Sequence, residues 1–194
     1  MSRVNVTQSD VMQSVIRRLR QELSLNDRQC FFVLNDQNGM PAIPVGVIGD
    51  GCYVTVAPGE SSIDDGLAVG EPIEQVTEYA TVHVTGLTRI HLDSTGHDEK
   101  LLLDETRGLL SIKHRILQAM CGQDLTLENG NTFLRELVRP VAIGSPQAGT
   151  IGENASLTVG FVTILFSVPF DWDLDDEPEE EDSSGSSSES SSST

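Results

Sequence analysis

The stretch LTVGFVTILFSVPF, residues 157–170, decides the fold, because it is one of the most apolar segments of the chain. Its apolar residues change phase along a predicted β-strand, first following one face and then the other. They are Leu157, Val159 and Phe161, then Val162, Ile164, Phe166 and Val168. A strand with one solvated face alternates apolar and polar side chains. This segment therefore needs cover on both faces.

Two explanations of the phase change stay open. A β-bulge at Gly160 would shift the alternation by one residue. Alternatively, a neighbouring subunit buries the second face, since two helices can cover only one face of a sheet. We favour the neighbouring subunit. It predicts a subunit interface formed by Phe161, Val162, Ile164, Leu165 and Phe166.

Helical periodicity marks two further segments. The first helix follows Thr7, a suitable N-cap with Asp10 three residues later in the capping-box arrangement, and is expected to end near Leu23. The second helix is predicted over residues 98–121, and Gly108 weakens its middle enough to kink or split it.

Short strands account for most of the remaining chain. We predict strands at residues 30–34, 42–48 and 52–58, a long strand at 78–92, and final strands at 133–143 and 156–170. The residues Gly49-Asp50-Gly51 predict a tight hairpin between the second and third of these. The order of elements predicts an α+β fold, with one mainly antiparallel sheet packed on one face by two helices.

The chain ends in DWDLDDEPEEEDSSGSSSESSSST, residues 171–194. This segment has ten acidic residues, no basic residue and nine serines, and it supplies ten of the 18 net negative charges. Its low hydrophobicity cannot offset the entropy lost on ordering. We therefore predict a domain over residues 1–174 and a disordered, acidic, serine-rich tail over residues 175–194.

Motifs of catalysis and metal binding are missing from the sequence. There is no GxGxxG, Walker A, HExxH or CxxC pattern, and His83 and His91 lack a supporting ligand at a suitable spacing. We predict no catalytic residue, no metal site and no cofactor.

The three widely spaced cysteines argue against a disulfide framework. Negative charge opposes binding to exposed nucleic acid, and no apolar stretch reaches the roughly 18 residues that span a bilayer.

Two surface segments are candidates for partner contact. Residues 59–72 are too long and polar for a tight turn, so we predict a projecting loop whose contact residues are Ser62, Ile63, Asp64 and Asp65. A solvated loop tip and weak cation binding are the other interpretations of its two aspartates. Arg17, Arg18 and Arg20 lie off the apolar stripe of the first helix and form a candidate basic contact face. A solvated helix face, partly paired with Glu22, is the simpler interpretation.

The layout of the elements resembles a known family. An N-terminal amphipathic helix and a hairpin precede the strand EYATVHVTGLTRIHL, the helix DETRGLLSIKHRILQAMCG and the closing strand LTVGFVTILFSVPFDWDL. This layout, over about residues 11–173, is similar to the tail terminator, or tail completion, proteins of tailed bacteriophages. Residues 111–120 are the most similar part. The acidic tail and the 59–72 segment depart from the family pattern.

The resemblance implies a structural protein of the virion. Such subunits form a ring, expected to be hexameric, that caps the tail tube, stops its polymerisation and connects it to the neck. The implied partners are copies of the same chain, the tail tube and neck proteins, with DNA only in passage and no membrane. Another head–tail connector, a neck protein, or a soluble adaptor with an acidic tail are the alternatives. An enzyme would need a cluster of convergent polar groups, which the sequence lacks.

Overall fold

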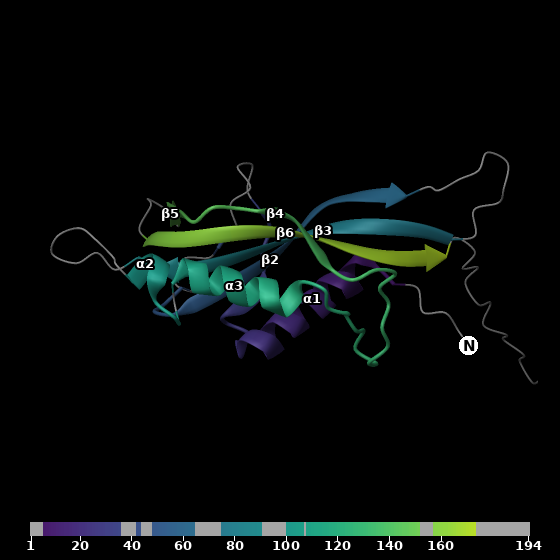
Figure 1. Cartoon of the computed structure of the whole chain (residues 1–194), viewed down its shortest axis with the longest axis horizontal. Coiled ribbons are helices and arrows are strands. Elements are labelled where there is room, and N and C mark those ends of the chain that lie inside the picture. The colour runs from purple at the N-terminus through teal and green to yellow at the C-terminus, as the bar shows by residue number, and fades with distance from the viewer. Residues whose placement is uncertain are drawn as a thin grey trace, which may run out of the picture.

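The computed structural model describes residues 6–35, 42–43, 48–64, 75–90, 100–106, 108–151 and 157–173. These residues form an α+β fold, as the sequence predicted (Figure 1). The elements in chain order are α1 (Gln8–Leu23), β1 (Cys30–Phe32), β2 (Cys52–Asp64), β3 (Gln75–Arg89), α2 (Lys100–Leu103), α3 (Leu109–Met120), β4 (Arg139–Ile143), β5 (Gln147–Ile151) and β6 (Leu157–Asp173). The predicted tail, residues 175–194, and its boundary at residue 174 lie outside the described residues.

One six-stranded sheet organises the chain. Its strand order is β1-β2-β3-β6-β4, and β5 also pairs with β6. Every pairing is antiparallel except that of β1 with β2. The shorter strands β4 and β5 pair with successive stretches of β6, opposite its long pairing with β3. The sheet is thus mainly antiparallel, as predicted.

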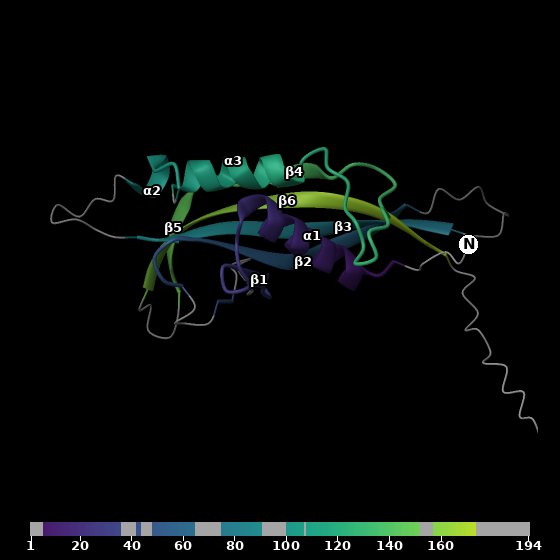
Figure 2. The same ribbon diagram turned by 90° about the horizontal axis from the view of Figure 1, so that it is seen from below.

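Both longer helices cover the same face of the sheet (Figure 2). The buried stripes of α1 and α3 pack on the even-numbered side chains of the central strands, and together they form the main core. The strand side chains in this core are Cys30, Cys52, Val54, Val56, Ala80, Val82, Val84, Val162, Ile164, Phe166, Val168 and Phe170. The helices therefore explain one apolar face of β6.

A second, smaller core lies on the opposite face and explains the phase change in β6. It gathers Val33, Ile43, Ile48, Tyr53, Ala57, Leu87, Val159 and Phe161 from four parts of the chain. The register between β3 and β6 runs without a break through Gly160, so no bulge occurs there. The chain itself buries Phe161, Val162, Ile164 and Phe166. The premise that a neighbouring subunit must cover them is wrong, and of the five predicted interface residues only Leu165 is partly exposed.

The capping box and the helix break predicted from the sequence are both present in the structure. Thr7 is the N-cap of α1: the Asp10 amide donates to its Oγ1 at 3.3 Å, and its own amide donates to Asp10 Oδ2 at 2.9 Å. The predicted second helix is split into α2, which ends at Leu103, and α3, for which Gly108 is the N-cap. A Cβ atom at that glycine would lie 2.7 Å from the backbone nitrogen of Asp104, which is too close for any larger residue.

Several strand predictions need correction. Residues 59–64, predicted as a loop, continue β2 beyond a register shift between Pro58 and Ser61, because β3 supplies a backbone partner for these polar residues. Residues 65–72 lie outside the described part. The hairpin at residues 49–51 is not formed among the described residues: β2 pairs with β1 in parallel, and residues 42, 43 and 48 are not in strands. Residues 133–138 are likewise not in a strand.

Candidate interaction surfaces

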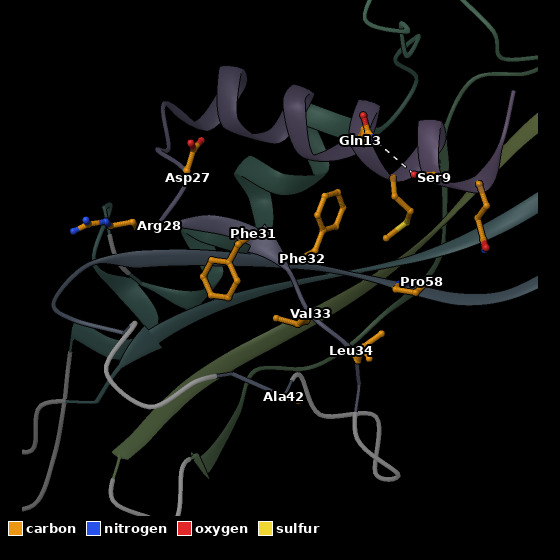
Figure 3. Close-up of a pocket in the computed structure, with 12 residues that line it drawn as sticks. Ser9, Gln13, Asp27, Arg28, Phe31, Phe32, Val33, Leu34, Ala42 and Pro58 are labelled. Atoms are coloured by element: carbon orange, nitrogen blue, oxygen red, sulfur yellow. Dashed lines mark hydrogen bonds between the residues drawn. The ribbon is translucent and has the colours of Figure 1, made fainter. Parts of the chain in front are cut away.

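A groove with a volume of about 960 Å³ runs between α1 and β1, at one edge of the sheet (Figure 3). One wall is the N-terminal half of α1, and the other is β1 with the two residues that follow it. The lining residues are Gln8, Ser9, Met12, Gln13, Asp27, Arg28, Phe31, Phe32, Val33, Leu34, Ala42 and Pro58. Seven of the twelve lining residues are apolar, and all of these except Met12 lie outside α1, so the wall formed by β1 and the residues after it is the apolar one.

Two large apolar side chains of this groove are open to solvent. Phe32 is 47% exposed and Leu34 is 71% exposed. Phe32 points toward α1, whereas Phe31 points to the other side of β1 (Figure 3), where it packs against the smaller core. The sequence predicted a strand at residues 30–34 but gave no sign of the groove, because alternation does not reveal which strand becomes a sheet edge.

The opposite edge of the sheet also exposes apolar side chains. All five residues of β4 are exposed, with Val141 at 56% and Ile143 at 50%. Leu137, just before the strand, is exposed as well. Among the described residues β4 pairs only with β6, and a register shift between Pro140 and Ala142 places Val141 outside the regular ladder. Exposed apolar residues on an edge strand are unusual, because such edges invite pairing with other chains.

The predicted partner residues Ser62, Ile63 and Asp64 lie on the distal part of β2, and Asp65 lies outside the described residues. Ser62 and Ile63 are exposed, and they pair in register with Tyr79 and Glu78 of β3. Figure 1 shows this end of β2 and β3 extending beyond α1. The segment is thus an exposed strand pair rather than a loop, and its role in partner contact stays a prediction.

The three arginines of α1 already bind backbone carbonyls of the chain. Arg17 donates to Thr126 O at 3.2 Å and Arg18 to Ala119 O at 3.2 Å. The guanidinium of Arg20 donates twice to Cys30 O, at 3.0 and 2.8 Å. These contacts hold α1 against its surroundings. Within the same chain Glu22 also pairs with Arg18 at 3.5 Å and Asp27 with Arg20 at 2.9 Å, so these contacts account for the arginines without another protein, and a basic contact face stays only a prediction.

Reactive groups are scarce in the described part of the chain. Burial raises the pKa of the Cys30 thiol to about 12 and that of Cys52 to about 11, so both thiols are protonated and unreactive near neutral pH. Within the described ranges, no group of three His, Cys, Asp or Glu residues could hold a metal ion. Burial lowers the pKa of His83, whose Nδ1 lies 3.0 Å from Asn35 Nδ2, and His91 lies outside the described part.

No protein-family model matches the chain, and no curated protein matches it. No helix of the described segments is long and apolar enough to cross a membrane.

Proposed function

We propose that this chain is a structural subunit that assembles with copies of itself into a ring, in the role of a phage tail terminator. The observation that carries the proposal is the pair of exposed apolar surfaces at the two edges of one sheet. Phe32 and Leu34 form one, and Val141 and Ile143 the other. Contiguous exposed apolar groups mark interaction sites, and a ring subunit needs two such sites.

The chemistry of the groove favours assembly over catalysis. Its polar side chains include Asp27, which is 86% exposed and bound to Arg20 at 2.9 Å. Catalytic groups instead tend to be partly buried, with pKa values shifted toward the pH at which they act. Among the described residues, the groups with large pKa shifts are the thiols of Cys30 and Cys52, which do not line the groove and which their raised pKa keeps protonated near neutral pH.

The specific role comes from the resemblance in element order. As a terminator, the ring would bind the last ring of the tail tube, stop further addition of tube subunits and present a surface to the neck. Outside residues 171–194 the chain keeps a net charge of about −8, since ten of its 18 net negative charges lie in that segment. An acidic lumen would repel DNA phosphates and let the genome slide through.

Two measurements test the proposal. Native mass spectrometry and negative-stain electron microscopy of the purified full chain should show closed rings with an open centre. Deleting the gene from the virus that encodes it should give overlong tails, because nothing stops the tube. Normal-length tails that fail to join heads would instead identify another neck protein. A chain that stays monomeric at all concentrations would refute the proposal.

A further inference from the structure

We infer that the β4 edge of one copy packs into the α1–β1 groove of the next copy, so that subunits meet head to tail. This inference rests on the proposed function, because it takes a second copy of the chain as the occupant of the groove. It adds which two surfaces meet and which side chains enter the groove.

The position of the two surfaces supports a head-to-tail contact. β1 and β4 are the outer strands of the sheet order, with three strands between them (Figure 2). One surface is hollow, and the other is a strand with protruding aliphatic side chains. A two-fold contact needs one patch that complements itself, whereas two unlike patches on opposite edges generate a ring or a filament.

The backbone of both edges disfavours a continuous sheet across the interface. Pro140 has no amide hydrogen to donate, and the irregularity at Val141 breaks the ladder of β4. On the other edge β1 has only three residues, and the Ala42 amide donates to the Leu34 carbonyl at 2.8 Å. Contact between the edges must therefore come mainly from side chains. Val141 and Ile143, each about half exposed, are the side chains available to fill the groove.

The charges around the two surfaces also suit each other. Asp27 and Arg28 line the groove, and Glu136 and Arg139 flank or begin β4; all four are exposed. Asp27 already pairs with Arg20 of its own chain at 2.9 Å, which leaves Arg28 as the base of the groove that can pair with Glu136 of the next copy across a head-to-tail contact. Complementary charges at the rim fix the orientation of partners and speed their association.

A small molecule is a poorer occupant of this groove. Its volume is within the range of ligand pockets, but such pockets enclose their ligand. Here Phe32 and Leu34 remain largely exposed, so the groove is open and its apolar walls stand out toward solvent. A protruding strand of another protein can cover such exposed side chains, whereas a small molecule in an open groove would leave much of them in contact with solvent.

Three variants of the full chain test the choice of surfaces. Leu34→Asp places a charge in the groove, Ile143→Asp places one on the β4 edge, and Leu103→Asp is the matched control on α2. Leu103 is 77% exposed and belongs to neither surface, and all three positions are exposed enough for the fold to tolerate a charge. We expect the first two substitutions to weaken self-association on the order of 100-fold, and the control to assemble like the unsubstituted chain. Light scattering after size-exclusion chromatography gives the masses, and circular dichroism checks the fold.

Mixing the two defective variants distinguishes a head-to-tail contact from other arrangements. The Leu34→Asp chain keeps an intact β4 edge and the Ile143→Asp chain keeps an intact groove, so their mixture should form a one-to-one dimer that neither forms alone. Assembly of Leu34→Asp or of Ile143→Asp at normal strength, or a mixture without dimers, would overturn the inference while leaving a ring intact as the proposed function. If the unsubstituted chain itself fails to assemble, the proposed function fails instead.

Discussion

Gly86 of β3 lies directly against Ile112 of α3, with no space for a methyl group between them. A Cβ atom built on Gly86 would overlap Ile112 Cγ2 and would lie 3.2 Å from Ile116 Cδ1. Both isoleucines are fully buried in the main core. The glycine therefore sets how closely α3 approaches the sheet, and through that contact it helps to hold the helix beside β6 and β3.

Replacing Gly86 by Ala should destabilise the protein by about 1–3 kcal/mol, because extra atoms in a packed core force side chains off their rotamers. Chemical unfolding in urea measures the change. Ile112→Ala removes the obstructing side chain and should itself cost about 2–5 kcal/mol. In the double variant the cost of the new methyl group should largely vanish. Strictly additive losses would show that the two residues do not collide.

His83 makes stability depend on pH. Burial lowers its pKa from the ordinary value of 6.5, and its Nδ1 faces the Asn35 amide, which can donate to a neutral imidazole. The folded chain thus binds fewer protons than the unfolded chain just below pH 6.5, so this contribution to stability is complete above that pH and is lost as pH falls. The loss of unfolding free energy between pH 7.5 and 5.5 should be smaller in His83→Gln. His114→Gln, on the exposed side of α3, should behave like the unsubstituted chain, and equal losses in all three proteins would contradict the assignment.

Arg20 of α1 donates two hydrogen bonds to the first residue of β1 and so links the two elements. Its Nε and Nη2 both donate to Cys30 O, while Nη1 binds Asp27. A lysine keeps the charge but cannot reproduce this geometry, so Arg20→Lys should lower the free energy of unfolding by about 1 kcal/mol. Arg17→Lys, which loses a single bond of 3.2 Å to Thr126 O, should cost less. Thermal unfolding of the two variants compares them, and a larger loss at Arg17 would refute this ranking.

The parts of the fold that the sequence predicted are those set by nearby residues. The ends of α1 follow from the Thr7–Asp10 capping box and from the stripe that ends at Leu23, and the helix break follows from Gly108. All of these signals act within a few residues, so periodicity and capping patterns are enough to read them.

The parts that sequence reasoning missed depend on contacts between distant segments. No pattern in the sequence around Cys30 or Val54 indicates that these two residues pair in parallel strands. Phe161 is buried in a cluster with Val33 and Tyr53, which lie far from it in the sequence. Because the sequence does not show that these segments meet, the burial of Phe161 was attributed to a second subunit. For the same reason the groove at Phe32 could not be foreseen, since exposure of a phenylalanine depends on which strand ends at the sheet edge.

The buried threonines of β3 offer a matched pair of substitutions with opposite expected signs. Thr88 is fully buried, and its hydroxyl has no hydrogen-bond partner among the described residues. Thr88→Val removes an unsatisfied polar group at nearly constant volume and should raise the free energy of unfolding by about 1 kcal/mol. Thr85 is also buried, but its hydroxyl shares a 2.9 Å hydrogen bond with Thr163 across β3 and β6. Thr85→Val should therefore lower the free energy of unfolding by about 1 kcal/mol. Urea unfolding under identical conditions compares the two, and a loss of stability in Thr88→Val would mean that its hydroxyl is hydrogen-bonded after all.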